Sequence, residues 1–448
     1  MNNLNKRSVR TAIIGAVIGL TGALPVVAAE TLKLLPAVAG DQIPGDLRPA
    51  ISAPWQNDNR EPVSVSYALD MDSALSLNPK PEAVESKEYW RKISGAELNR
   101  GIDLPTTAPG ALLRISGFGN GNQASKSVLL VDGEALSLRS PQGREQSLAS
   151  AAQSLYQAAK DQPSNLPFAR GSVAAKLDAD MGAGVFTLTA KQPMPADAEF
   201  VVQVFEPDSP YRLQAKHANY NVLAGGSLNA EGVLLHEQSA SQAAKALPVQ
   251  AISAVLLAPD GRRLPLTVAR GTGNRWQIAQ LLDAPTADVP GLWEVEWQLK
   301  TTDNGLTVER QLRSAFAFAA PSARLGKQLQ LSKTASNVTL QIPLTVASEG
   351  RYEVRAVVSG KDGTGVVRPV LFASSANWLQ AGERKLSLTL DKSVLTEAGV
   401  SGTLAVQDLQ LIDQSRMSVL QRQAQALSLR PAQWQGNARL ADNGRDRR

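Results

Sequence analysis

Apolar and polar residues alternate along much of the chain from about Ser172 onward. Over 338–346, valine, leucine or isoleucine fills every second position, and the positions between hold threonine, glutamine and Pro343; 293–300 and 385–391 alternate in the same way. Successive side chains of a strand point to opposite faces, so these segments are predicted to be half-buried antiparallel strands. Because proline has no amide N–H, Pro343 predicts an edge strand or a bulge.

Asn-Gly and Asp-Gly dipeptides separate many of the apolar runs. They stand at 120–121, 132–133, 260–261, 304–305 and 362–363. Asparagine and aspartate tolerate a positive φ and glycine adopts one freely, as tight hairpin turns require. Short strands joined by such turns at spacings of about 8–12 residues predict an all-β protein of several β-sandwich domains.

The segment from Arg144 to Asp161 is the clearest exception and predicts one helix of about four to five turns in the N-terminal unit. Pro163 stands where this helix would end. Its apolar positions are Leu148, Ala151, Ala152, Leu155 and Ala159. Because alanine dominates that face, we expect the helix to pack on a sheet or to lie in a loop.

Clusters of proline, alanine and polar residues mark the expected joints between domains. We expect, in chain order, a signal peptide (1–29), an extended leader (30–60), an N-terminal β-rich domain (61–235), two immunoglobulin-like β-sandwiches (248–320 and 326–430) and a flexible polar tail (431–448).

The N-terminus has the pattern of a secretory signal. Three basic residues are followed by the apolar stretch 11–27, and small residues at 28 and 29 precede Glu30. A transmembrane anchor is the alternative, but the stretch is rich in glycine and at the lower limit for spanning a bilayer. We therefore expect cleavage, a periplasmic or secreted protein and no membrane span afterwards.

The formal net charge of +5 lies at the two ends of the chain. The first 29 residues contribute +3 and 431–448 contribute +2, which leaves the body without formal net charge. Proteins that bind nucleic acids usually gather lysine and arginine in a patch, because phosphate contacts supply much of the affinity. No such run stands between the ends, so we expect no nucleic-acid partner.

Few residues suited to catalysis or metal binding are present. The chain has no cysteine and two histidines, His217 and His236. It therefore has no disulfide, thiolate metal site or cysteine nucleophile, and a Ser-His-acid set would need one of these two histidines. The G-x-S-x-G, H-E-x-x-H and calcium-loop motifs do not occur. We predict no cofactor, no metal and no familiar catalytic centre, so an enzyme is the less favoured class.

Three tryptophans are the candidates for binding contacts. Trp55 falls in the predicted leader, Trp90 in the N-terminal domain and Trp434 in the polar tail. An exposed tryptophan can anchor a protein partner or stack on a sugar. For Trp55 and Trp434, packing against their own domains is the favoured interpretation.

Two stretches of the chain resemble one another. Gly-Leu-Trp-Glu-Val-Glu at 291–296 matches Gly-Arg-Tyr-Glu-Val-Arg at 350–355, and each is followed by an aspartate twelve residues after its glycine, Asp303 and Asp362. This echo predicts two related β-domains that use the same strand–turn–strand unit.

Several segments resemble an uncharacterised family of secreted gammaproteobacterial proteins, in which a domain of unknown function precedes immunoglobulin-like β-domains. They are Glu88–Leu98, Ala108–Ile115, Arg368-Pro369, Ala376–Gly382 and Asp413–Leu420. The resemblance implies an envelope or secreted location and immunoglobulin-like sandwiches. It supplies no catalytic residues.

These patterns predict a non-catalytic binding or scaffolding protein of the bacterial envelope or the medium, which acts through sandwich loops and strand edges. Its partner is expected to be a protein or a glycan of the envelope. The alternatives are a hydrolase with paired carboxylates in the first unit, acting on envelope polysaccharide or peptide, and a carbohydrate-binding module with exposed aromatic residues.

Overall fold

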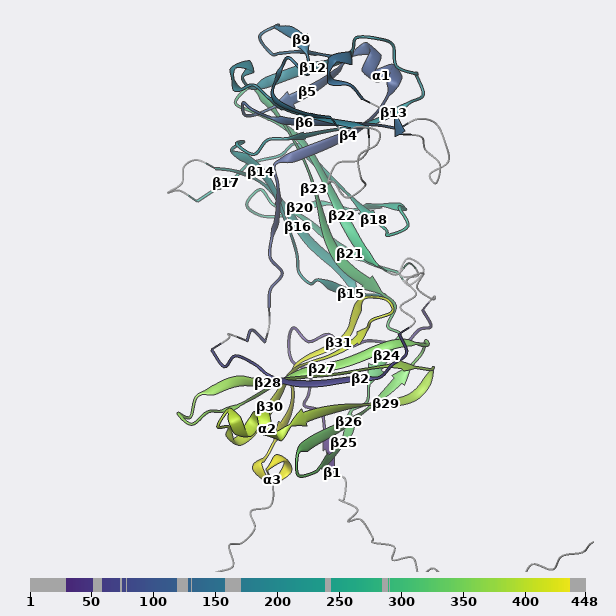
Figure 1. Ribbon diagram of the computed structural model, residues 1–448, viewed down its shortest axis with the longest axis vertical. Helices are drawn as coiled ribbons and strands as arrows, with labels where there is room; N and C mark the ends of the chain where they lie inside the picture. The colour runs from purple at the N-terminus through teal and green to yellow at the C-terminus, as the bar shows by residue number, and fades with distance from the viewer. Residues whose placement is uncertain are drawn as a thin grey trace, which may run out of the picture.

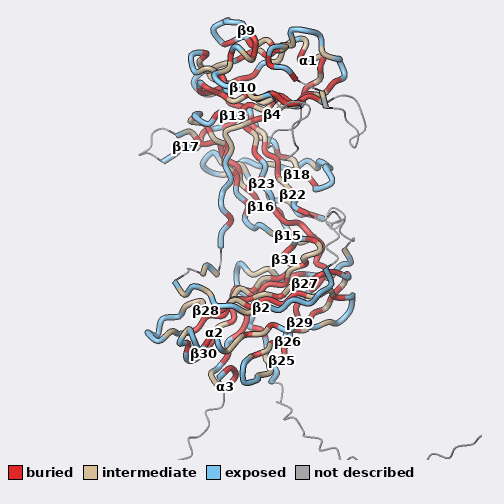
Figure 2. Tube along the Cα trace, in the orientation of Figure 1, coloured by how far each residue is buried: buried red, intermediate tan, exposed pale blue. Residues whose placement is uncertain are grey.

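Strands make up most of the computed structural model, and together they form three sandwiches arranged along a rod (Figure 1). The structure describes residues 30–50, 59–72, 75–77, 79–118, 128–129, 131–157, 171–237, 243–283, 289 and 291–435. The predicted signal peptide and residues 436–448 of the predicted tail lie outside these ranges. Figure 2 shows buried positions along the strands of each sandwich and exposed positions mainly in the turns and loops.

The first sandwich encloses a core that includes Leu104, Phe186 and Phe200. Helix α1 (Gly95–Arg100) begins with a capping box, in which Ser94 and Glu97 satisfy each other's backbone N–H groups. One sheet has the order β10 (Ala152–Gln157), β11 (Ser172–Leu177), β6 (Leu112–Phe118), β13 (Glu199–Phe205) and β4 (Glu88–Ser94), with β7 (Val128–Leu129) on β6. The other has β5 (Ile102–Thr106), β12 (Gly184–Ala190), β8 (Leu136–Arg139) and β9 (Glu145–Ser147), and the short 3₁₀ turns are Gly133–Ala135 and Ala179–Met181.

The second sandwich is built around Trp293 and Trp297, both fully buried, as their alternation with polar residues predicts. Gly232 lies so close to Trp297 that an added Cβ would be 3.0 Å from its ring. One sheet has the order β20 (Ala269–Arg270), β21 (Trp276–Leu281), β16 (Ser227–His236), β14 (Tyr211–His217) and β3 (Val84–Ser86), with β17 (Lys245–Ala246) on β16. The other has β15 (Asn221–Leu223), β23 (Leu306–Ala319), β22 (Leu292–Asp303), β18 (Ala251–Leu257) and β19 (Arg263–Leu266).

The third sandwich takes strands from both ends of the chain. One sheet has the order β1 (Glu30–Lys33), β25 (Gln328–Lys333), β26 (Asn337–Val346) and β24 (Ala323–Leu325), with β29 (Gly382–Asp391) on β26. The other has β2 (Val63–Ala68), β28 (Val367–Leu379), β27 (Gly350–Lys361), β30 (Ser401–Asp413) and β31 (Ser418–Leu429); the helices are α2 (Lys392–Glu397) and α3 (Pro431–Trp434). After β2 the chain runs along the second sandwich to reach β3 (Figure 1).

The predicted all-β, multi-domain fold is confirmed, and so are its three clearest strands, which are β22, β26 and β29. The turns at 260–261, 304–305 and 362–363 close hairpins. The two echoing stretches also form equivalent units, because β22 with β23 and β27 with β28 are both long antiparallel hairpins.

The helix predicted from Arg144 to Asp161 is wrong over its described part. Residues 145–147 form β9, 148–151 form a turn and 152–157 form β10, which pairs with β11. Leu148 and Ala151 are buried, but by a turn rather than by a helical face. Pairing with β11 therefore overrides the helical preference of this alanine-rich segment. Residues 158–161 lie outside the described part.

The edge predicted from Pro343 is wrong, and the irregularity at this position lies in the partner strands, where residues 326–329 face only Ile342 and Pro343. Strand β26 is central, with β29 along one side and with β25 and then β24 along the other. The Pro343 carbonyl accepts a hydrogen bond from Gly326 N at 2.7 Å, between the ends of β24 and β25. The proline nitrogen faces the same gap, so no ladder hydrogen bond to β29 is lost.

The sheets divide the chain at other points than the predicted boundaries. Strands β14 and β16, placed in the N-terminal domain (61–235) by prediction, belong to the second sandwich. The predicted leader (30–60) contributes β1, and Leu35 and Gln42 form backbone hydrogen bonds to Ala426 and Arg422 of β31. The third sandwich is therefore discontinuous in sequence.

Candidate functional site

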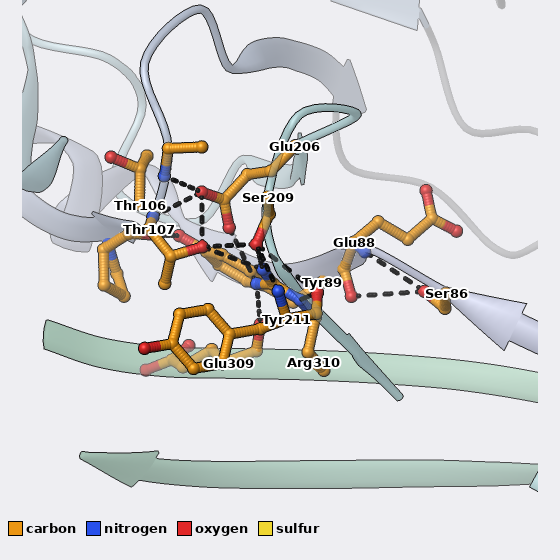
Figure 3. Close-up of polar contacts among 12 residues, drawn as sticks. Ser86, Glu88, Tyr89, Thr106, Thr107, Glu206, Ser209, Tyr211, Glu309 and Arg310 are labelled. Atoms are coloured by element: carbon orange, nitrogen blue, oxygen red, sulfur yellow. Dashed lines mark hydrogen bonds and ion pairs between the residues drawn. The ribbon is translucent and has the colours of Figure 1, made fainter. Parts of the chain in front are cut away.

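The joint between the first and second sandwiches is organised by Arg310. This residue lies in β23 of the second sandwich, is 0% exposed, and reaches between two loops of the first sandwich, one after β5 and one after β13 (Figure 3). A guanidinium group has five N–H donors, and all of them are used. They reach Glu206 Oε2 at 2.7 Å, Glu309 O at 2.6 Å, Tyr211 O at 3.1 Å, Thr107 Oγ1 at 3.0 Å and Ser209 Oγ at 2.6 Å.

The other carboxylate oxygen of Glu206 is equally well satisfied. It accepts hydrogen bonds from Thr107 N, Thr107 Oγ1 and Ala108 N. Burying a charge is costly unless it is paired and fully hydrogen-bonded. This ion pair meets both conditions, so it fixes the two sandwiches relative to each other. Because Arg310 and Glu206 are buried and fully occupied, they are not placed to act on a substrate.

A groove of about 460 Å³ runs beside this joint, lined by Glu85, Glu88, Trp90 and Arg313 among others. Trp90 is partly exposed, but the guanidinium of Arg313 lies over its ring at 5.0 Å, and its backbone N–H donates to Gln311 Oε1 of β23. Trp90 therefore contributes to the joint as well as to the groove.

A second groove, of about 550 Å³, is lined by residues that include Tyr89, Arg91, Lys300 and Glu309. Glu309 pairs with Arg91 at 2.6 Å and with Lys300 at 2.8 Å. Burial would raise the pKa of Glu309, but the hydrogen bonds and charges of these two cations outweigh it and lower the pKa.

The other two candidate tryptophans have different outcomes. Trp55 lies outside the described residues. Trp434, a candidate for an exposed contact in the predicted polar tail, is 5% exposed, belongs to helix α3, and donates from Nε1 to Gly402 O at 2.9 Å. Since it packs into the core of the third sandwich, it is not available to a partner.

The joint between the second and third sandwiches is short and buried. Every residue from 319 to 323 is buried between β23 and β24. The carboxylate of Asp413 accepts hydrogen bonds from Ser322 Oγ at 2.6 Å and from Arg416 Nη1 at 2.7 Å. This second buried ion pair holds the connection against the end of β30.

A cleft of about 860 Å³ lies at this second joint, and we refer to it as the joint cleft. Four separate stretches line it: residues 40–48, Pro79 with Pro81, residues 219–227 and the outer face of the β27–β30–β31 sheet. Its polar lining residues are Asp41, Gln42, Asp46, Arg48, Asn219, Tyr220, Asn221, Ser227, Arg355, Gln410 and Arg422.

The floor and one wall of the joint cleft are held in place by hydrogen bonds. On the floor, Arg355 Nη2 donates to Gln410 Oε1 at 3.0 Å, and Arg422 Nε donates to Asp408 at 2.6 Å. Tyr220 is 50% exposed, and its hydroxyl accepts a hydrogen bond from Glu82 N at 2.8 Å. The ring is thus tethered at its tip while much of its surface stays open.

The groups needed for familiar catalysis are not brought together. His217 is buried, its Nε2 lies 2.8 Å from Ser314 Oγ, and burial lowers its pKa. Its Nδ1 meets no hydrogen-bond partner among the described residues, so no carboxylate completes a triad there. His236 is partly exposed and lies against the ring of Tyr211. Within the described ranges, no group of three histidine, aspartate or glutamate side chains could hold a metal ion.

The sequence reasoning did not single out Arg310, Glu206 or the joint cleft. For Arg310 a signal was present, because it occupies a core-facing position in the alternation of β23, between buried Val308 and Leu312. A charged residue in such a position indicates a buried ion pair. The joint cleft has no local signal, since the stretches that line it lie apart in the chain.

In the part of the chain that the structure describes, no helix is long and apolar enough to cross a membrane.

Among solved structures, a DUF4785 family protein from Legionella pneumophila is similar with a TM-score of 0.64 and 20% identity, over 88% of this chain and 98% of that one. An α-2-macroglobulin from Escherichia coli matches with a TM-score of 0.21 and 16% identity, over 73% of this chain and 22% of its own. The adhesin FdeC from Escherichia coli matches with a TM-score of 0.19 and 15% identity, over 77% of this chain and 100% of its own. The first shows a shared fold, and the other two scores are too low to carry an argument.

No curated protein matches the chain. The N-terminal domain of the DUF4785 family, a domain of unknown function, matches residues 54–206, and its C-terminal domain matches residues 322–430. The chain therefore contains the N-terminal and the C-terminal domains of the DUF4785 family.

Proposed function

We propose that the chain is an exported, non-catalytic binding protein of the bacterial envelope or medium, built from immunoglobulin-like sandwiches, and that it holds a polyhydroxylated ligand of the glycan type in the joint cleft. The observation that carries the proposal is the joint cleft itself. Its volume of about 860 Å³ suits an oligosaccharide, and its lining mixes amide, hydroxyl, carboxylate and guanidinium groups. Export is supported by the signal-like N-terminus.

The open ring of Tyr220 suits a sugar in particular. Sugars present apolar C–H faces that stack on aromatic rings, while their hydroxyls need both donors and acceptors. Asp46 and Arg48 belong to another stretch of the lining, and both are exposed. A tethered ring and a prearranged floor lower the entropy lost on binding.

We favour binding over carboxylate-dependent hydrolysis because of the direction in which the carboxyl pKa values are shifted. A general acid at neutral pH needs a raised carboxyl pKa. Wherever the surroundings clearly shift a carboxyl pKa among the described residues, they lower it. These residues are Glu97, Asp132, Asp260, Glu296, Glu309, Glu349 and Asp362.

Calorimetric titration tests the proposal, with chitotetraose, maltoheptaose and soluble peptidoglycan fragments as probes. At least one probe is expected to bind, and Tyr220→Ala is expected to weaken that binding by about tenfold because the stacking surface is lost. Tyr220→Phe keeps the ring, so its affinity for the probe should lie between those of Tyr220→Ala and the wild type. Arg262→Ala changes an exposed hairpin residue that does not line the joint cleft, and serves as the control. Failure of every probe to bind, or equal binding by Tyr220→Ala and the wild type, would contradict the proposal.

A further inference from the structure

Strand β2 forms an open edge of the third sandwich. It pairs with β28 along one side, from Val63 opposite Ala376 to Ala68 opposite Leu371. No other strand in the described ranges pairs with its second side. In Figure 1 it is the dark purple strand that crosses the front of this sandwich.

Most of the features that usually protect an edge are missing here, although the end of β29 lies beside β2, where Asp391 N donates to Ser66 Oγ at 3.1 Å. Natural edge strands are blunted by lysine, proline, a bulge or shortness. Val63–Ala68 contains neither charge nor proline, and its register with β28 is regular over all six residues. Val63, Val65 and Tyr67 share one face and are 42%, 42% and 50% exposed.

The backbone of β2 is correctly oriented to accept another strand. Leu69 N donates to Val370 O at 3.0 Å, which continues the register of the β2–β28 ladder. Backbone groups of alternate residues point to opposite sides of a strand. Val63, Val65 and Tyr67 therefore direct their N–H and C=O groups to β28, while Ser64, Ser66 and Ala68 direct theirs outward.

We propose that two copies of this chain pair antiparallel through β2 and join their sheets into one. Pairing centred on Ser66 places Ser66 opposite its own copy and Ser64 opposite Ala68, so every outward N–H and C=O of the three residues is satisfied. The same register places Val65 opposite Tyr67 on the exposed face. Apolar cross-strand pairs of this kind stabilise sheets.

The second copy is the occupant because the strand is complementary to itself. An antiparallel register brings apolar residues opposite apolar residues on one face and small polar residues together on the other, without a charge on either side. A two-fold interface requires the same patch to match itself in this way. A single strand pair is a small interface, so the dimer should be weak, with a dissociation constant in the micromolar range. This pairing does not depend on the joint cleft or on its ligand.

Sedimentation equilibrium of the full chain across the micromolar range tests the pairing. The wild type is expected to shift from monomer to dimer as concentration rises. Val65→Lys puts a charge into the apolar row beside the two-fold axis, and should weaken dimerisation by about tenfold or more. Val185→Lys is the matched control, because Val185 is a 43% exposed strand residue of the first sandwich and should leave the dimer unchanged.

A second variant guards against misfolding of the first. Ser64→Pro removes one outward N–H without adding charge, and should also weaken the dimer while the thermal unfolding curve stays close to that of the wild type. A wild type that remains monomeric at every concentration would overturn the proposal. So would Val65→Lys or Ser64→Pro proteins that fold and dimerise as tightly as the wild type.

Discussion

At the residue scale, the most consequential side chains are charges that are completely enclosed. Arg310 and Glu206 form a pair in which both side chains are 0% exposed, and each end has its full set of hydrogen bonds. A buried pair of this kind adds little net stability over apolar residues, yet it cannot lose one member cheaply. Its value lies in the geometry it enforces, because Glu206, Thr107 and Ser209 all reach the guanidinium of Arg310 in only one arrangement of the two sandwiches.

We expect Arg310→Met to lower the free energy of unfolding of the first two sandwiches by about 3–5 kcal/mol, because Glu206 is then left buried without a counter-ion. Urea unfolding followed by tryptophan fluorescence measures the loss. Arg262→Met is the matched control: it breaks the exposed pair with Asp260, and should change the free energy by less than about 1 kcal/mol. Equal losses in the two variants would show that the buried pair is not special.

His217 should make the second sandwich sensitive to acid. Burial lowers the pKa of His217 in the folded state. In the unfolded chain its pKa is about 6.5, so as the pH falls the unfolded chain takes up a proton before the folded protein does. The stability contribution is therefore complete above about pH 6.5 and is lost as the pH falls toward the lowered folded-state pKa.

Thermal unfolding between about pH 7 and pH 5 tests the role of His217. As the pH falls, the free energy of unfolding of the wild type should decrease by up to about 1 kcal/mol per pH unit more than that of His217→Gln. A His217→Gln protein with the full acid sensitivity of the wild type would rule the explanation out.

At the element scale, hairpins that look alike in sequence place different demands on their turn residues. In the β22–β23 hairpin, Asn304 and Gly305 have φ values of 48° and 78°. Both angles lie in the left-handed region, which matches the twist of the strands. In the echoing β27–β28 hairpin, Gly363 does not have a positive φ and faces open space.

Gly305→Ala should therefore cost about 1 kcal/mol of stability, because alanine is strained at this φ. Gly363→Ala should change stability by less than about 0.5 kcal/mol, since its added methyl group meets nothing. Chemical denaturation of the two variants side by side gives the comparison. If both cost the same, the conformational explanation fails.

The same scale shows why some elements could be predicted and others could not. Strands β22, β26 and β29 have one face toward water, so their alternation is visible in the sequence. The segment 144–157 has no such alternation, and its alanines favour a helix until β11 provides a pairing partner. Pro343 predicts an edge or a bulge because it lacks an N–H group. The local sequence cannot reveal that β24 and β25 end beside it, so that a proline fits within a central strand.

At the scale of the whole molecule, the relations that matter join residues hundreds of positions apart. Glu30 lies opposite Leu331 in the β1–β25 ladder, and Val63 lies opposite Ala376 in the β2–β28 ladder. Local patterns do not encode such pairings, so the predicted leader was given no part in a sandwich. The joint cleft also brings together stretches that lie far apart in the chain, so it could not be predicted. The buried charge at Arg310 could have been predicted from its core-facing position in β23.

This arrangement predicts that the N-terminal segment stays bound even when it is no longer covalently attached. A protease recognition sequence inserted between Lys80 and Pro81 would cut the connection between β2 and β3. The released piece carries both β1 and β2, and Arg351 Nη1 also holds it through the carbonyls of Asn59 and Glu61 at 2.7 and 2.8 Å. After cleavage the two pieces should co-elute in gel filtration and separate only in denaturant, since the ladders with β25 and β28 remain intact. Because the cut removes the entropic benefit of a continuous chain, the melting temperature of the third sandwich should fall without complete unfolding. Prompt loss of the N-terminal piece under native conditions would mean that β1 and β2 are accessories rather than constituents of that sandwich.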